Sequence, residues 1–526
     1  MATTHYALLV YGLTNAALYS VLLPLWEGFD EPFHFAYVQF LANGNGFPDP
    51  RTSRLSREVR TSLLLAPASL SVQRNLPEVT SYDEFFRWPE SIRRQAHQQL
   101  WRIDPSLRRV PSEFVDYEAL QAPLAYAILA LPERVLANVP LPKRVLVLRM
   151  FAGVLGGLLL LFGAQRLGVQ LGVTEPHNAI AIFCAVSSQM FWATVAHVAN
   201  DWLAVPLAVW LLVAVIHYYE GPSPQRAVLA SAVLSIGLLT KAYFLSFVPL
   251  VALVCVFRRR WRDLGFALAI IGLFAGPWYT RNIVHYGTIS AMQELREGAD
   301  PAKALHAMRL EKLPTGFDRC LREALWTGNN SFRSFSMNTL RAVIAVWAIA
   351  LVLWVTKKHR PTEWIVLLYA GLFILALAYD TSINYVASHG EATGPCPWYT
   401  QTLLVPALIL CFKGTAQSPK AGKVVAVLLM LLFGYVLVAT YWLKLIPLYS
   451  GFYGRTSWAS VTTLYGKQLS MLTARLNEVC LVPATTIMFL AGLVTALAVG
   501  QQLVFVTDVV LSKPCENTDL VKPPTV

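Results

Sequence analysis

Long apolar blocks separated by short polar stretches constrain this chain more than any other feature of its sequence. Most blocks are roughly 20 residues long, which is the length that an α-helix needs to cross a hydrocarbon core of about 30 Å. Only 14% of the 526 residues are charged, whereas a soluble globular chain carries about 25%. The sequence therefore excludes an ordinary cytosolic enzyme and a disordered chain, and it predicts a polytopic membrane protein.

Twelve apolar blocks are candidates for transmembrane helices. The predicted fold class is thus an all-α integral membrane protein with about 12 spans. The paired blocks on either side of Lys241 could instead form one bent helix or a tight hairpin. The candidate spans are residues 6–25, 143–166, 178–196, 201–219, 226–240, 242–257, 264–281, 338–356, 362–379, 398–413, 422–444 and 483–507.

Basic residues in the short loops indicate the orientation, because cytoplasmic loops of membrane proteins are rich in Lys and Arg. The run from Arg258 to Arg262 follows the sixth span, and Lys357–Arg360 follows the eighth. By contrast, the loop from Asp380 to Trp398 contains no Lys or Arg. A topology in which successive spans alternate in direction puts all the basic loops on the cytoplasmic side, and it also puts both termini in the cytoplasm. The same rule explains the net charge of +12, so we expect membrane lipids and no nucleic acid as partners.

This topology divides the chain into a polytopic membrane domain, residues 1–513, and a disordered cytoplasmic tail, residues 514–526. Three large loops then lie on the non-cytoplasmic face, at residues 26–142, 282–337 and 445–482. Long loops are usually functional, and the first is expected to carry helices that lie at the membrane interface. Because no eukaryotic retention signal is present, we expect a bacterial inner membrane with the active site facing the periplasm.

Two carboxylates are expected at the same depth on the external face. Asp30 follows the first span and Asp201 opens the fourth. Each could simply be a helix N-cap, a position that Asp favours, and Pro32 suits the first turn of a helix. Paired acids below a large loop are also what a sugar-transfer site needs. One carboxylate can deprotonate an acceptor hydroxyl while the other orients substrate or holds a cation.

The acidic turn Trp26-Glu27-Gly28-Phe29-Asp30-Glu31-Pro32-Phe33-His34 resembles the first external loop of GT-C class glycosyltransferases. The most similar group is the family 39-like one, which is related to protein O-mannosyltransferases and bacterial aminoarabinose transferases. Further segments resemble signatures of that group and occur in the same order: Tyr117–Tyr126, Asn200-Asp201, Leu238–Lys241 and Pro277–Asn282.

This resemblance implies an inverting glycosyltransferase that moves a sugar from a polyprenyl-phosphate-linked donor to a lipid, glycan or protein acceptor on the non-cytoplasmic face. It implies Asp30 as the catalytic base, with Glu31 or Asp201 assisting. Lys241 and Arg281 are expected to bind the donor phosphate. The alternatives are a lysine that snorkels to the interface and a plain boundary arginine. Other residues expected to line the substrate cavity are His34, Tyr37, Gln121, Asn200 and Asn282.

The sequence also departs from the family pattern at two places. Ala122 replaces the first proline of a Gln-Pro-Pro motif, and Gly394–Tyr399 stands where the group has Gly-Arg-Tyr. The loss of that arginine puts a phosphate or acceptor contact there in doubt. Two other functions remain open: a lipid-linked-sugar flippase or transporter, and a non-catalytic scaffold in envelope biogenesis. A transporter predicts polar residues scattered through the spans, whereas the ionisable residues here cluster at one face.

No metal site is predicted, because no His pair or Glu-His pair has the spacing of metal ligands. A divalent cation held loosely by Asp30 and Asp201 stays open as a cofactor. The segment from Arg51 to Arg109 holds eleven Arg and six acidic residues. We expect these arginines to pair with acids of the same loop, and contact with anionic headgroups or a phosphorylated acceptor is the alternative.

Overall fold

The computed structural model describes residues 2–69, 72–73, 76, 78–292, 302, 313–326, 335–391, 394–452 and 457–511. These residues are almost entirely helical. The sheet among them has two short antiparallel strands, β1 (Arg54–Ser56) and β2 (Pro111–Val115), with Arg54 opposite Val115. The predicted tail at 514–526, and parts of the predicted loops 282–337 and 445–482, lie outside the described residues.

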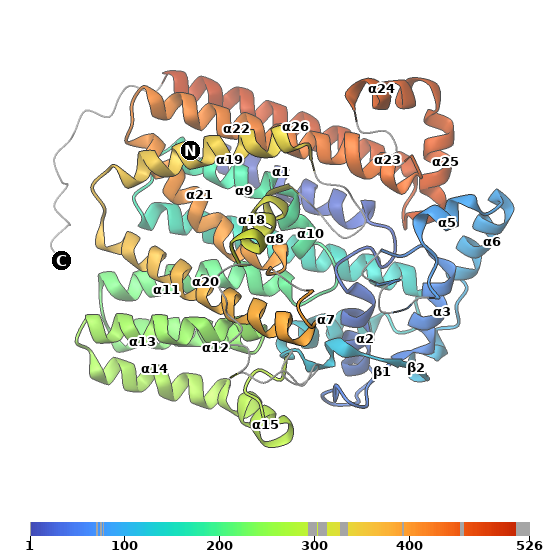
Figure 1. Ribbon diagram of the computed structural model, residues 1–526, viewed down its shortest axis with the longest axis horizontal. Coiled ribbons are helices and arrows are strands. Elements are labelled where there is room, and N and C mark those ends of the chain that lie inside the picture. Colours follow the sequence, from blue (N-terminus) through green and yellow to red (C-terminus); the bar gives the residue numbers. More distant parts are fainter. Residues whose placement is uncertain are drawn as a thin grey trace.

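Helices of 7 to 30 residues form the body of the molecule, and the longest of them run side by side (Figure 1). They are α1 (Ala2–Leu22), α8 (Leu141–Gln170), α9 (His177–Ser187), α10 (Gln189–Val195), α11 (Asp201–Glu220), α12 (Pro224–Leu238), α13 (Val248–Phe257), α14 (Trp261–Phe274), α15 (Gly276–Tyr286), α19 (Met337–Val355), α20 (Pro361–Ala387), α21 (Gln401–Ala416), α22 (Ala421–Ala439) and α26 (Ala484–Leu511). Shorter elements connect or cap them: η3 (Ala242–Phe247), α18 (Leu313–Trp326), η4 (Pro397–Thr400), η5 (Thr440–Leu445), α23 (Ile446–Tyr449), α24 (Trp458–Lys467) and α25 (Leu469–Val479).

Among the described residues, six helices are long and apolar enough to cross a membrane, and the chain is an integral membrane protein. Two bent pairs, α9 with α10 and α14 with α15, bring the number to eight if each pair is one span; they bend by 60° and 57°. The predicted count of twelve is not confirmed. Pro224–Leu238 and Ala242–Phe257 are apolar, but they are shorter than the roughly 20 residues that a perpendicular span needs.

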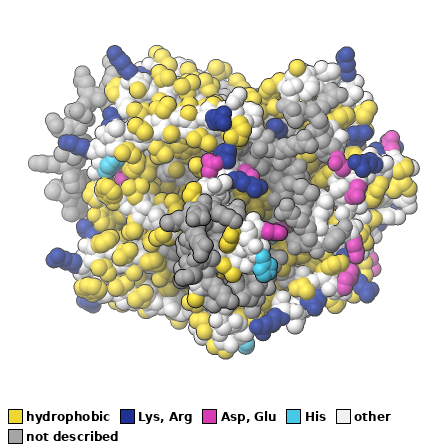
Figure 2. All heavy atoms as spheres, viewed as in Figure 1, with side chains coloured by type: hydrophobic (Ala, Val, Ile, Leu, Met, Phe, Trp, Pro, Cys, Tyr) yellow, Lys and Arg dark blue, Asp and Glu magenta, His cyan; other side chains and the backbone are white. Residues whose placement is uncertain are grey.

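The surface of the bundle has the character of a lipid-facing surface. Hydrophobic side chains cover much of the face shown in Figure 2. Val352, Leu375 and Leu503 are examples of apolar side chains that are at least 60% exposed. Acidic side chains in Figure 2 gather instead at the end formed by the first loop, where Glu78 and Glu90 are exposed. On this face, acidic side chains are thus denser on the first loop than on the bundle.

The first loop folds into a cap at one end of the bundle, while the N-terminus lies toward the other end (Figure 1). Local signals start its helices: Ser56 accepts the Val59 N–H, and Ser81 forms a capping box with Glu84. Besides β1 and β2, its elements are α2 (Glu31–Ala42), α3 (Arg57–Leu65), α5 (Tyr82–Arg87), α6 (Glu90–Leu100), η1 (Pro105–Arg109), η2 (Tyr117–Leu120) and α7 (Leu124–Val135).

Helix α2 does not lie on the surface of the protein, while the expectation of interfacial helices in the rest of this loop stays a prediction. The sequence predicts an aromatic helix that lies along the bilayer surface, but nearly every residue of α2 is buried inside the protein. It packs against α7 and η2. Its polar side chains have partners there, since Gln39 donates to Glu58 and His34 is hydrogen-bonded to Tyr126. An all-round buried helix of this kind is a core element.

Buried ion pairs attach the cap to the bundle. Arg144 on α8 contacts both Glu58 of α3 and Glu133 of α7, and all three side chains are fully buried. The predicted pairing within the Arg-rich segment holds for Arg60 with Glu78 and for Arg94 with Glu90. Glu58 is an exception to this pairing within the loop, because its carboxylate pairs with Arg144 of the bundle.

We predict that Arg144→Met strongly destabilises the protein, because removing one partner of a buried ion pair leaves uncompensated charge and costs about 3–5 kcal/mol. Thermal unfolding of the purified protein in detergent measures this. The control is Arg94→Met, which removes an exposed i,i+4 pair and is expected to cost less than about 1 kcal/mol. Equal midpoints for the two variants would contradict the anchoring role of Arg144.

Candidate functional site

The turn between α1 and α2 has an unusual backbone. Trp26 and Asp30 both have positive φ angles, of 64° and 51°, in a region that L-residues other than Gly seldom adopt. A side chain at Gly28 would place its Cβ 2.7 Å from the ring of His197. The Trp26 ring is fixed by a 2.9 Å hydrogen bond from its Nε1 to Ser62. Surrounding structure therefore holds this turn in a strained conformation, as is common at functional sites.

Asp30 occupies the N-cap position of α2, but its side chain makes no capping hydrogen bond. The capping alternative for this acid is thus wrong. Pro32 lies in the first turn, where the sequence predicts it. An N-cap side chain usually accepts a hydrogen bond from the backbone N–H of the second or third helical residue, and the Asp30 carboxylate makes no such bond.

Glu31 is a fully buried anchor of the same turn. Its carboxylate forms an ion pair with Arg149 of α8 and accepts the Val198 N–H at 3.0 Å. Arg149 also donates to the Leu23 carbonyl at 2.6 Å and to the Pro24 carbonyl at 2.9 Å. Burial alone would raise the pKa of Glu31, but Arg149 outweighs it and lowers the pKa overall. Glu31 therefore stays ionised and joins the turn to two parts of the bundle.

Asp201 and Lys241 form a second buried ion pair. The Lys241 Nζ lies 2.6 Å from each Asp201 carboxylate oxygen, and each residue is only 5% exposed. Asn200 takes the N-cap position of α11, so Asp201 is the first helical residue and does not act as the cap. Lys241 does not snorkel to a surface. It is held at the end of α12, where the chain turns into η3.

A large cavity adjoins Lys241. Its volume is about 610 Å³, and it lies between η3, α20 and residues 287–292. The ammonium group of Lys241 is 4.9 Å from the centre of the Tyr399 ring. Leu245, Ile289 and Leu377 contribute to walls that are mostly apolar. Tyr399 ends the segment Gly394–Tyr399, so an aromatic ring of this segment contacts Lys241.

Three of the predicted lining residues belong to one hydrogen-bonded cluster, and a fourth, His34, lies beside it. The Asn200 Nδ2 donates to Gln121 at 3.1 Å, and the Tyr37 hydroxyl donates to the Gln121 carbonyl at 3.1 Å. Gln121 in turn donates to Glu118 at 2.9 Å, and Glu118 lies 3.6 Å from the Nδ1 of His34. The segment from Tyr117 to Tyr126 thus reaches the acidic turn in space.

His34 stands where the predicted charged residues converge. Its Nδ1 is 2.8 Å from the Tyr126 hydroxyl. Burial lowers the pKa of His34 to about 4, and the charges of Asp30, Lys241 and Asp201 all act on it. The imidazole is therefore neutral near pH 7. The Asp201–Lys241 pair adjoins this cluster through Asn200, which donates to Gln121 at 3.1 Å and to the Thr240 carbonyl at 3.3 Å.

Arg281 and Asn282 lie on α15. Arg281 donates to the Pro48 carbonyl at 3.4 Å and stands over the ring of Trp278 at 4.9 Å. Asn282 donates to the Ile289 carbonyl at 3.2 Å, on the segment that borders the large cavity. The predicted role of Arg281 in phosphate binding stays a prediction.

Sequence reasoning missed several residues of this cluster, chiefly Glu118, Tyr126, Arg149 and Tyr399. Glu118 and Tyr126 lay inside a quoted motif but received no role. Arg149 is an arginine inside a predicted span, and an ionisable residue at such a place is itself a signal of function. Its partner is 118 positions away in the chain, so nothing in the sequence pairs it with Glu31.

The ion pair between Asp201 and Lys241 affects whether Asp30 and Asp201 could hold a divalent cation. No group of three His, Cys, Asp or Glu side chains in the described part of the chain is placed to hold a metal ion. The Lys241 ammonium group contacts both oxygens of Asp201 and therefore takes the place that a cation would need. Cation binding at Asp30 and Asp201 stays a prediction.

Comparison with known proteins gives similarities in structure. No family model and no curated protein matches this sequence. The chain is similar to ArnT from Cupriavidus metallidurans bound to undecaprenyl phosphate, with 13% identity over 96% of this chain and 78% of that one and a TM-score of 0.47. For ArnT in the apo state the identity is 14%, the coverage 95% and 78%, and the TM-score 0.46.

A third similar structure is the Archaeoglobus fulgidus oligosaccharyltransferase in the apo form. The identity is 10%, the aligned region covers 95% of this chain and 56% of that one, and the TM-score is 0.37. At such low identities and TM-scores, function has to be argued from the residues of this chain.

We predict that the protein loses stability on acidification below about pH 6.5. Burial lowers the pKa of both His34 and His197 to about 4, whereas an unfolded histidine titrates near 6.5. The unfolded chain therefore binds more protons between these values, and stability rises with pH across that window. Going from pH 7 to pH 5 is expected to cost about 2 kcal/mol for each of the two histidines.

Thermal unfolding between pH 5 and pH 7 checks this expectation. His197→Asn is expected to flatten the pH dependence of the unfolding midpoint, while His285→Asn, at an exposed position, is expected to leave it unchanged. An equal slope for wild type and His197→Asn would contradict the assignment.

Proposed function

We propose that this chain is an inverting glycosyltransferase of the GT-C class. In this proposal it transfers a sugar from a polyprenyl-phosphate-linked donor to an acceptor hydroxyl on the non-cytoplasmic face of the membrane. The observation that carries the proposal is the position of Lys241. It is a buried cation, fixed by Asp201, at the wall of a large and mostly apolar cavity, and Asn200 next to Asp201 joins it to the hydrogen-bonded cluster at Gln121.

The cavity suits the two parts of a lipid phosphate. An ammonium group has three donors, and Asp201 accepts from two of them, which leaves the third for a phosphate oxygen. The prenyl chain would pack against Leu245, Ile289 and Leu377. A volume near 610 Å³ is within the usual range for small-molecule sites, which is about 300–1,000 Å³.

The chemistry assigns different tasks to the three acids. Asp30 accepts the proton of the acceptor hydroxyl, whose oxygen attacks the anomeric carbon from the side opposite the phosphate. The bond between that carbon and the phosphate oxygen breaks, and its electron pair leaves with the polyprenyl phosphate. Lys241 stabilises this developing charge. Asp201 positions Lys241, and Glu31 positions the turn that carries Asp30.

We predict that Asp30→Asn abolishes sugar transfer, because an amide cannot accept the proton of the acceptor. The assay incubates purified protein and membrane extract with a panel of radiolabelled polyprenyl-phosphate sugars and measures covalent product. Asp83→Asn, at an exposed position in the same loop, is the matched control and is expected to keep full activity. Retained transfer by Asp30→Asn would refute the base assignment. Labelled sugar trapped in vesicles without covalent product would indicate a transporter instead.

We also predict that Lys241→Met and Asp201→Asn weaken donor use through one shared interaction. The single variants are expected to raise the donor KM, and the double variant is expected to be no worse than Lys241→Met, because Asp201 acts through Lys241. A double variant that multiplies the two single effects would show instead that Asp201 has an independent role.

A further inference from the structure

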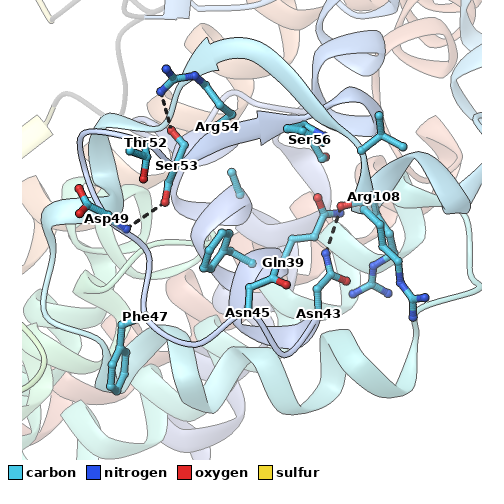
Figure 3. A pocket seen from close by; sticks show the side chains of 15 residues that line it. Gln39, Asn43, Asn45, Phe47, Asp49, Thr52, Ser53, Arg54, Ser56 and Arg108 are labelled. Carbon is cyan, nitrogen blue, oxygen red and sulfur yellow. Dashed lines mark hydrogen bonds between the residues drawn. The ribbon is translucent and has the colours of Figure 1, made fainter.

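A second cavity, of about 360 Å³, lies inside the cap (Figure 3). Its wall is formed by the C-terminal end of α2, the loop that follows it, β1 and η1. Three arginines of the Arg-rich segment contribute to this wall, and they are Arg54, Arg108 and Arg109. The proposed sugar transfer uses none of these residues.

Hydrogen bonds within the cap fix the shape of this cavity. Asn43 donates from Nδ2 to the Arg108 carbonyl at 3.1 Å, and the Asp49 N–H donates to the Ser53 hydroxyl at 3.0 Å. Both bonds are drawn in Figure 3. Because the first bond ties η1 to the end of α2 and the second closes the loop that follows α2, the walls are set before any ligand binds.

The charged side chains of the lining are unequal in number. Three arginines stand against one carboxylate, that of Asp49. This carboxylate accepts the Arg51 N–H at 2.8 Å, so part of its hydrogen-bonding capacity is used by the loop itself. Among the described residues, neither Arg54 nor Arg109 forms an ion pair. The lining therefore has an excess of positive charge.

Arg108 is the buried member of this group, and its charge is incompletely compensated. Its side chain is 5% exposed, yet its Nε and Nη1 have no hydrogen-bond partner. Its ion pair with Glu133 spans 3.5 Å, and Glu133 is shared with Arg144. Burial raises the pKa of Glu133 to about 7, so this group is protonated part of the time at neutral pH. Buried charged donors without acceptors are costly, and an anion beside Arg108 would lower that cost.

Arg134 offsets the negative end of the α2 dipole at the same cavity. The last carbonyl groups of a helix carry partial negative charge, which would disfavour an anion. Arg134 on α7 donates from Nε to the Ala42 carbonyl at 3.2 Å and from Nη2 to the Leu41 carbonyl at 3.4 Å. A further positive charge thus lies at the end of α2, where basic side chains stabilise free carbonyl groups.

A phosphate group has the charge and the acceptors that this lining lacks. A phosphate monoester carries about −1.5 to −2 charges at pH 7 and three strong acceptor oxygens, and guanidinium groups bind phosphates through paired hydrogen bonds. Asn45 and Thr52, both exposed to solvent, add an amide and a hydroxyl donor. We propose that this cavity binds a phosphate group, which is carried either by a lipid headgroup or by a soluble phosphorylated compound.

Binding of radiolabelled inorganic phosphate tests this proposal without sugar transfer. Lys241→Met in detergent serves as the background, because Lys241 is itself proposed to bind a phosphate. Equilibrium dialysis is expected to find one phosphate site there. Arg109→Gln should weaken this site roughly tenfold. Arg54→Gln should weaken it less, because Arg54 also donates to two backbone carbonyls at 3.4 Å. Arg102→Gln, which removes an exposed charge from the same cap, is the matched control and should bind phosphate unchanged.

Two lipid conditions separate the sources of the phosphate. If a lipid headgroup reaches the cavity, nanodiscs that contain phosphatidic acid should reduce the binding of inorganic phosphate relative to nanodiscs of phosphatidylcholine alone. Equal binding in the two would assign the site to a soluble phosphorylated compound. The proposal would be overturned by the absence of a saturable site, by equal displacement with acetate at the same ionic strength, or by undiminished binding in both Arg54→Gln and Arg109→Gln.

Discussion

The buried pair of Glu31 and Arg149 is the interaction on which the site depends. The ion pair fastens the turn after α1 to α8. The Glu31 carboxylate also accepts a hydrogen bond from the Val198 N–H, just before α11. Asp30 is the neighbour of Glu31 and has a positive φ. A strained residue of this kind keeps its conformation only when its surroundings are fixed. Desolvating two charges is costly unless they are paired, so the position of the turn is tightly specified.

The Asp201–Lys241 pair adds a neutral but polar wall to this site. Lys241 is buried beside Tyr399 and an apolar cavity, a location where an unpaired ammonium group would be strongly disfavoured. Asp201 makes that location possible. A phosphate that approaches Lys241 would therefore meet a preorganised donor, which needs little rearrangement as charge develops on the leaving group.

Some features of the site could be predicted from local sequence, and others could not. Asp30, Pro32 and Asp201 stand at the starts of α2 and α11, where the sequence predicts helices to begin, although neither acid caps its helix with its side chain. The burial of α2 could not be predicted, since its aromatic pattern fits a bilayer surface as well as a protein interior. Arg149 and Glu118 could be seen as unusual residues, but their partners lie 118 and 84 positions away.

The sequence by itself determined that this is a helical membrane protein, and it identified the acidic turn, because helix length, hydropathy and helix-start residues are local properties. Only the tertiary structure decided what each acid does. Whether a carboxylate is an anchor, a partner of a lysine or a strained residue beside a neutral histidine depends on which distant groups surround it. That environment is created by packing, which folds the cap onto the bundle and excludes water from the ion pairs between them.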